Sequence, residues 1–429
     1  MHVRKLLAAS VCLAFAAPAF AQTPTPKAAP GVDRASYHSA LFNPAEELPP
    51  NLSSHTEAAM QASSPAENLL AGPQIWASAD YLLWYITPMN TPDLIQSVPG
   101  RAAVNSVQQN AILPGSAATR IFPDGRQVQF GGFNGIRGSM GAYLDPASRF
   151  GVDASVFILE TKIQKGSAFN NGTPDAIAQQ YFNVQTGRPI SLFASLEGTS
   201  AGGIVSHVES ATWGADANVR MQAYTLFADR NDFLAGVRYF SLAESIQTEA
   251  RSFFARTGGA VGIQDTVRTR NQYYGGQVGV ASRLGACNRG LGIDAGLKFG
   301  MGGVRQEAQI FGSNTFLSAA GVADTQLQGL FARPFNQGSF SRNKFAVLTD
   351  LNLNLTYNFT PAAKVYFGYN VMWVSSVIRP GEVIDPIIND SRARFVANPT
   401  PSTADRPAFS WNANDMWVQG MTFGVNLAY

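Results

Sequence analysis

The sequence predicts an all-β fold, a single antiparallel up-and-down barrel that crosses a membrane with about ten strands. Three observations predict this fold. Apolar and polar residues alternate with a period of two over most of residues 73–429, as they do in strands with one lipid face and one polar lumen face. No segment after the N-terminal leader approaches the roughly 18 apolar residues of a membrane-spanning helix. Short turns also alternate with long loops, which is the pattern of outer-membrane barrels.

The first part of the chain directs export. Residues 1–21 have a basic start, a short apolar run and a small-residue cleavage site, which together indicate a secretory signal peptide. Residues 22–72 are rich in Pro, Ala, Ser and Thr without periodicity, which predicts a disordered periplasmic linker. We expect the barrel to occupy residues 73–429. The predicted cleavage site consists of Ala19, Ala21 and Gln22.

The composition excludes several classes of function. Without Arg4 and Lys5 of the signal segment, the chain has 29 basic and 29 acidic residues, and this balance argues against a nucleic-acid partner. Only Cys287 remains after the signal segment, so an intrachain disulfide is impossible. One cysteine and three histidines are too few to favour a structural zinc site. We therefore expect no metal and no cofactor.

The ten predicted strands are separated by two kinds of connection. The strands are residues 75–87, 134–144, 151–162, 211–227, 233–248, 269–284, 290–306, 343–358, 364–377 and 415–429. The short turns are residues 145–148, 228–232, 286–289 and 360–363. The long loops are residues 88–133, 164–210, 249–268, 307–342 and 378–413. Short turns face the periplasm in such barrels and long loops face outward. The first two long loops have room for another hairpin, so twelve strands is the alternative.

The last strand carries the expected assembly signal. Its apolar face ends in aromatic and aliphatic residues, a pattern typical of the strand that closes an outer-membrane barrel. We expect the barrel-insertion machinery to recognise this face, and we also expect periplasmic chaperones and outer-membrane lipids as partners. The predicted signal consists of Phe423, Val425, Leu427 and Tyr429.

The polar faces of the strands predict the lumen. In strand 343–358, Asp350 and Asn352 alternate with Leu351 and Leu353, and a row of Asp and Asn cannot face lipid. The charges expected in the lumen either line a narrow aqueous path that tunes ion selectivity, or pair as a salt-bridge core that fills a small barrel. The candidate lumen charges are Asp80, Arg137, Asp153, Asp216, Arg220, Arg238, Asp294, Lys298, Lys344, Asp350 and Lys364.

Two further segments carry specific hypotheses. Residues 377–385 are placed at the outer rim, where Arg379 and Asp385 are expected to pair at the base of the last loop. Ser206, His207 and Glu209 form the only set that resembles a hydrolase site. Neighbouring residues on a strand point to opposite faces, however, so a Ser–His hydrogen bond between them is awkward. We predict that the protein is not an enzyme.

Several stretches, in this order, resemble the BBP7 family of porin-like outer-membrane β-barrel proteins of planctomycete type. The resemblance spans most of the chain after the linker and implies a barrel in the bacterial outer membrane, without catalytic residues or cofactors. It implies passive diffusion of small solutes or ions only by analogy. The alternatives are a non-conducting structural or adhesive barrel that acts through its outer loops and, more remotely, an outer-membrane hydrolase. The resembling stretches include WASADYLLWYI (76–86), YLDPASRFGVDASVF (143–157), SRNKFAVLTDLNLNLTY (341–357), FGYNVMWVSSVIRPGEVID (367–385) and DMWVQGMTFGV (415–425).

Overall fold

The computed structural model describes residues 75–100, 118–223, 228–285, 289–392 and 403–429. All of them belong to one of the chain's two compact units, Asn68–Tyr429. The predicted signal peptide, with its cleavage site at Ala19, Ala21 and Gln22, and the predicted linker lie outside the described residues. No helix within the described residues is both long and apolar enough to span a membrane.

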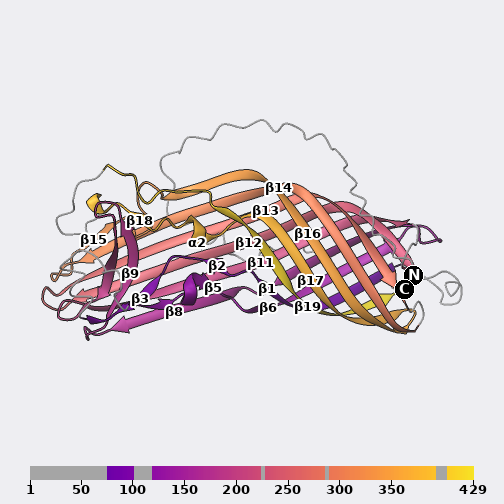
Figure 1. Ribbon diagram of the computed structural model, residues 1–429, viewed down its shortest axis with the longest axis horizontal. Helices are drawn as coiled ribbons and strands as arrows, with labels where there is room; N and C mark the ends of the chain where they lie inside the picture. Colours follow the sequence, from indigo (N-terminus) through magenta and orange to yellow (C-terminus); the bar gives the residue numbers. More distant parts are fainter. Residues whose placement is uncertain (1–74, 101–117, 224–227, 286–288, 393–402) are drawn as a thin grey trace, which may run out of the picture. The chain divides into compact units, whose positions relative to one another are not determined.

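Ten antiparallel strands close into a ring, as the sequence predicts (Figure 1). Each strand pairs with the next in chain order, and the last pairs with the first. Ile75 and Tyr429 complete the closure by exchanging backbone hydrogen bonds of 2.7 and 3.1 Å. The ring consists of β1 (Ile75–Ile86), β6 (Gly132–Tyr143), β7 (Phe150–Leu159), β11 (Ala201–Ala223), β12 (Arg230–Phe254), β13 (Gly259–Leu284), β14 (Gly290–Leu317), β16 (Gly338–Thr360), β17 (Ala363–Ile378) and β19 (Ala413–Ala428).

Near the short turns, the outward-facing residues form an apolar band. On β13, Tyr274, Val278 and Val280 are exposed, whereas Tyr273 and Gln277, at odd positions of the same strand, face inward and are buried. This part of β13 spans residues 274–284, and a tilted strand needs roughly 9–11 residues to cross a bilayer. The band therefore matches the hydrocarbon layer. Aromatic residues line the edge of the band that is farther from the short turns, as in the interfacial girdles of membrane proteins. They include Tyr85, Trp213, Tyr239, Tyr274, Phe345, Trp373 and Trp417.

The strands continue far beyond this girdle. β12 runs to Phe254 and β13 begins at Gly259, so the predicted long loop at 249–268 is wrong. Much of the predicted loops 164–210 and 307–342 is also strand. On these extensions most outward residues are polar, for example Gln247, Arg270 and Arg305, although a few such as Phe253 are apolar. The inward face mixes polar with apolar residues, so the sequence lacks the contrast between faces that identifies a strand.

A second, smaller sheet packs against the inner face of these extensions. β8 (Lys162–Asn170) continues the line of β7 along β11. The order of the small sheet is β10 (Arg188–Ser195), β9 (Ala176–Asn183), β3 (Ile95–Val98) and β4 (Thr119–Phe122), and β18 (Ile387–Ile388) pairs with β9. We call these five strands the cap. The remaining elements are β2 (Met89–Asn90), η3 (Asp124–Arg126), β5 (Gln127–Val128), β15 (Ala323–Gln326), α2 (Pro380–Val383) and η4 (Asp390–Arg392).

One strand separates from its neighbour before it ends. The pairing of β16 with β17 ends at Leu348 and Val374, whereas Val377 and Ile378 still pair with β19, and Ser376 has a positive φ of 57° that bends the chain. The next residues cross the lumen, where Ile378 exchanges hydrogen bonds of 2.8 and 2.9 Å with the side chain of Asn271 on β13. Residues 378–390 therefore fill space inside the extended part of the barrel.

Candidate functional site: the barrel lumen

The lumen has two chemically different halves. The inward face of β1 changes from Ser78 and Asp80 near the short turns to Leu82, Trp84 and Ile86 at the other end. β16 changes in the same way, from its Asn row to Leu348 and Ala346. The outward face changes in the opposite sense near the same level. Inside the bilayer the wall is apolar outside and polar inside, whereas beyond it the wall has the polar exterior and apolar interior of a protein in water.

The apolar half closes the cross-section of the barrel. One contiguous cluster of buried side chains includes residues from all ten ring strands, together with residues of the cap and of segment 378–390. Because these inward side chains have almost no accessible surface, no water-filled path runs beside them in the described structure. The ten strand residues, each at most 5% exposed, include Trp84, Phe133, Phe157, Val208, Phe240, Val267, Val304, Leu348, Met372 and Val418.

Two tryptophans near the ends of β1 differ from the aromatic residues of the girdle. Trp76 and Trp84 both face the lumen. Trp84 lies 5.2 Å from Phe157 between ring centroids inside the apolar half. Trp76 lies under the guanidinium of Arg220 at 5.6 Å in the polar half. Neither can serve as an interfacial anchor, because β1 presents its odd-numbered residues to lipid.

The polar half contains a cavity of about 300 Å³, which we call the vestibule. The short turn at Thr360, Pro361 and Ala362 lies at its edge, so it opens at the end of the barrel that carries the short turns. In outer-membrane barrels this end faces the periplasm. The apolar half lies at its other end, which makes the vestibule blind in the described structure.

Ten of the eleven predicted lumen charges form ion pairs with one another in this half. Arg137 Nε lies 2.6 Å from Asp80, Arg220 Nε lies 3.5 Å from Asp153, and Arg238 lies 2.6 Å from Asp350. Lys298 pairs with Asp216, and Lys364 pairs with Asp294 at 2.5 Å. Such pairing offsets part of the cost of removing the charges from bulk water. Lys344 is the exception, because it lies exposed on β16 beyond the point where β17 separates from β16.

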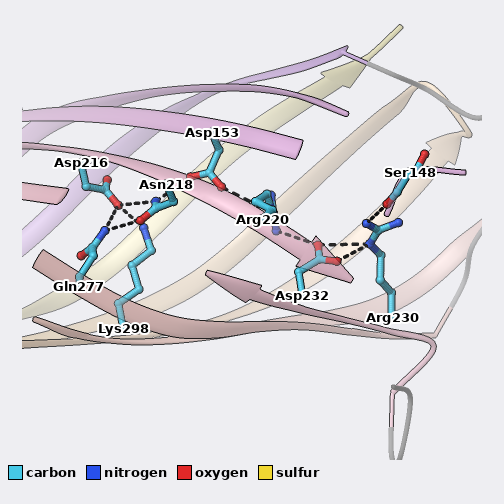
Figure 2. A network of polar contacts seen from close by, with 9 residues as sticks. All are labelled: Ser148, Asp153, Asp216, Asn218, Arg220, Arg230, Asp232, Gln277 and Lys298. Atoms are coloured by element: carbon cyan, nitrogen blue, oxygen red, sulfur yellow. Dashed lines mark hydrogen bonds and ion pairs between the residues drawn. The ribbon is translucent and has the colours of Figure 1, made fainter. Parts of the chain in front are cut away.

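Figure 2 shows that two of these pairs, Arg220 with Asp153 and Lys298 with Asp216, belong to one larger network. Asp216 accepts hydrogen bonds from Asn218 at 3.1 Å and from Gln277 at 3.0 Å, and Lys298 reaches the same carboxylate from β14. Towards the turns, Asp232 lies 3.3 Å from Arg220 and 2.9 Å from Arg230. Five strands thus contribute to a continuous row of charges and amides.

The sequence reasoning missed Asp232 and Arg230 because it placed both in the turn at 228–232. β12 begins earlier, at Arg230. Asp232 is separated by an even number of residues from Leu234 and Arg238, so it lies on the same inward face. Extending the period-two pattern backward from Arg238 was the signal that could have identified it.

Another buried ion pair lies within the apolar half. Arg379 donates to Glu244 through Nε at 2.8 Å and through a terminal nitrogen at 2.5 Å, and it also donates to the carbonyl oxygen of Thr87 at 2.6 Å. Arg379 is 4% exposed and Glu244 is fully buried. The predicted pairing of Arg379 with Asp385 is wrong. Asp385 pairs with Arg406 at 2.8 Å, because the bend at Ser376 carries Arg379 into the lumen.

The carboxylate of Asp265 holds the loop around residues 330–332 against the extended strands. Asp265 on β13 accepts hydrogen bonds from the backbone N–H groups of Leu330, Phe331 and Ala332 at 2.8–3.0 Å. Burial raises the pKa of Asp265 to about 6, although these bonds and Arg333 act in the opposite direction. The polar residues of the apolar half therefore hold the inserted segments in place.

The set that resembled a hydrolase site is divided between two faces of the sheet. The Ser206 hydroxyl faces inward, is fully buried and lies 3.0 Å from the Thr248 hydroxyl. His207 is the next residue on β11, so it faces outward, and it pairs in register with Lys165 and Gln247. Among the described residues, no group of three or more His, Cys, Asp and Glu side chains could hold a metal ion.

The predicted assembly residues all lie on the lipid-facing side of β19. Phe423, Val425 and Leu427 are 41–48% exposed, and Tyr429 ends the strand beside Ile75. Phe423 packs against Phe367 of β17 at 5.0 Å between ring centroids. Their recognition by the barrel-insertion machinery stays a prediction.

A comparison with protein families agrees with this architecture. No curated protein matches the sequence. The chain is similar to the outer membrane protease OmpT from Escherichia coli at 10% identity, covering 83% of this chain and 97% of that one, with a TM-score of 0.36. It is similar to a Pseudomonas aeruginosa FadL homologue at 9% identity, covering 83% and 90%, with a TM-score of 0.21. The family described as "Putative beta barrel porin-7 (BBP7)" matches residues 76–429. The chain therefore belongs to this family and is an outer-membrane β-barrel protein.

Proposed function

We propose that this protein is an outer-membrane barrel that does not conduct solutes in its resting state and that acts through the half extending beyond the bilayer. The observation that carries this proposal is the apolar cluster drawn from all ten ring strands. It supports the non-conducting alternative over the porin-like diffusion that the sequence first suggested. Catalysis is not part of the proposal.

The physical reason is the cost of moving a hydrated solute through a dry interior. Transferring a charged or polar group into an apolar environment without partners costs several kcal/mol by rough estimate. The inward side chains at this level are almost fully buried, so the path offers a solute neither water nor free polar groups. Small barrels commonly have interiors that side chains fill.

A second candidate is porin-like diffusion through a lumen that opens when residues 378–390 move. The vestibule favours it, because a polar chamber already leads halfway through the barrel. The attachment of this segment also favours it, because the segment crosses the lumen on a few polar anchors such as Glu244 and Asn271. Passage would then require these anchors to break.

Single-channel recording in a planar bilayer tests the proposal. We expect the mature wild-type protein to insert without producing discrete conductance steps, with insertion verified by flotation with liposomes and by the heat-dependent mobility of folded barrels. Reproducible steps from the wild-type protein at low voltage would overturn the resting closure. Steps from Arg379→Gln but not from the matched control Arg305→Gln, which alters an exposed outward ion pair, would favour the second candidate.

A further inference from the structure

We propose that the vestibule is a blind binding site for a small organic anion, bearing carboxylate or phosphate groups, that enters from the periplasmic end. The proposal shares the closed lumen with the proposed function, but binding at this site does not depend on whether the barrel ever conducts. The shape of the cavity, the balance of charge on its wall and the donors that this wall leaves unused favour such a ligand.

The shape of the vestibule suits a ligand better than it suits permeation. Its volume of about 300 Å³ is at the lower end of the range for small-molecule pockets, roughly 300–1,000 Å³. It opens beside the turn at Thr360 and Pro361, and the apolar half closes the other end. A solute that enters must leave by the same route, as in a binding pocket.

The wall of the vestibule has more cations than anions. Six basic side chains and four acidic side chains line it. Asp216, behind the wall, pairs with Lys298, so the remaining excess is one positive charge. In a confined site away from bulk water, such an excess favours ligands of the opposite sign. The basic residues are Arg137, Arg220, Arg230, Arg283, Lys298 and Lys364, and the acidic residues are Asp80, Asp153, Asp232 and Asp294.

Each of the four carboxylates already has at least two partners. Asp80 is bound by Arg137 and by the hydroxyl of Tyr366, and Asp294 is bound by Arg283 at 3.3 Å and by Lys364 at 2.5 Å. Asp153 and Asp232 are held in the same way within the network of Figure 2. A cationic ligand would therefore have to displace an existing ion pair.

The guanidinium groups, in contrast, keep unused donors. Arg137 and Arg283 make their ion pairs through Nε, which leaves the terminal nitrogens of each fork for a ligand. The Arg283 side chain is 49% exposed, so its terminal nitrogens are accessible to a ligand. A guanidinium fork matches the geometry of carboxylate and phosphate oxygens, which selects these two groups among anions.

Aromatic rings hold two of these cations in place. Arg220 lies over Trp76 at 5.6 Å, and Arg230 lies over Tyr143 at 4.5 Å. Stacking of this kind restricts the rotamers of the guanidinium groups before a ligand arrives. Less conformational entropy is then lost on binding, which increases affinity without additional contacts.

Isothermal titration of the mature protein in neutral detergent tests the proposal, with citrate and inorganic phosphate as anionic probes. Putrescine and glucose serve as cationic and neutral comparisons. We expect saturable binding of citrate, phosphate or both, and weaker binding at higher salt. Binding of citrate alone identifies a carboxylate site, and binding of phosphate alone identifies a phosphate site. The proposal would be overturned if neither anion binds at millimolar concentration, or if putrescine binds as tightly as the anions do.

Variants locate the binding in the vestibule. Arg283→Gln should weaken anion binding about tenfold or more, because a charge-assisted hydrogen bond is lost while Lys364 still holds Asp294. The matched control Arg251→Gln, which alters a 75% exposed side chain far along β12, should bind as the wild type does. Equal affinities for these two variants would refute the site. If Arg283→Gln fails to fold, Arg283→Lys, which keeps the charge but not the fork, should show a smaller loss. These outcomes are independent of conductance.

Discussion

The ion pair between Glu244 and Arg379 provides the sharpest test of how the lumen is closed. Glu244→Gln removes the negative charge and preserves the shape of the side chain. Arg379 then keeps its hydrogen bond to the carbonyl oxygen of Thr87 at 2.6 Å, but it loses the carboxylate that balances its charge. Both side chains are buried in the apolar half, at 5% and 0% exposure.

The expected cost follows from this burial. Removing one partner of a buried ion pair leaves an uncompensated charge and typically costs about 3–5 kcal/mol of stability. Replacing both partners with apolar residues of similar volume is often neutral or stabilising. We therefore expect Glu244→Gln to lower the free energy of unfolding by about 3–5 kcal/mol. The double variant Glu244→Leu with Arg379→Met should recover most of this loss.

The assay is urea unfolding in detergent micelles, followed by tryptophan fluorescence and by the heat-dependent mobility of the folded barrel. The single variants Glu244→Leu and Arg379→Met complete a double-mutant cycle with the double variant. A loss below about 1 kcal/mol for Glu244→Gln, typical of an exposed pair, would refute our placement of the pair in the dry half. Additive losses in the double variant would show that the two side chains are not coupled.

Three further predictions test other parts of the structure. Because burial raises the pKa of Asp265 from 3.8 to about 6, the folded chain binds this proton more tightly than the unfolded chain does. This contribution to stability is present below pH 4 and is lost as the pH rises through 6, a change of about 3 kcal/mol. Asp265→Asn should flatten the profile of unfolding free energy against pH, whereas the exposed control Asp124→Asn should retain it. Val278→Lys, on the lipid face, should cost about 2–4 kcal/mol, and Thr266→Lys, on the same face of β13 above the girdle, should cost little; equal effects in urea titrations would contradict the position of the band. Deleting residues 423–429 should leave the protein in the periplasm on cell fractionation, and normal insertion would disprove the role of that segment.

The membrane-spanning part of the fold could be predicted from the sequence because each strand contacts two different environments, one on each of its faces. Lipid outside and water or paired charges inside produce an alternation that neighbouring residues alone reveal, as with Leu351, Asn352 and Leu353. The same alternation identified ten charges that the structure pairs in the polar half. It also predicted ten strands and the closing position of 415–429.

The extensions beyond the bilayer escaped this reasoning for a physical reason. Their inward residues include anchors such as Glu244 and Asp265 among aliphatic side chains, while their outward residues meet water. The two faces then differ too little for periodicity to detect, and segment 249–268 reads as a loop although it is mostly strand. The role of a polar residue on an inward face can be recognised only when the residue that it pairs with is known.

By itself, the sequence determined the ring of alternating strands and the chemistry of the bilayer half, because both depend on residues close together in the chain. Only the tertiary structure decided that the lumen is closed. That outcome depends on the separation of β17 from β16 near Ser376, and on Arg379 meeting Glu244 from a segment 135 residues away. Such contacts join strands on different sides of the barrel, and no local pattern records which residues will meet there.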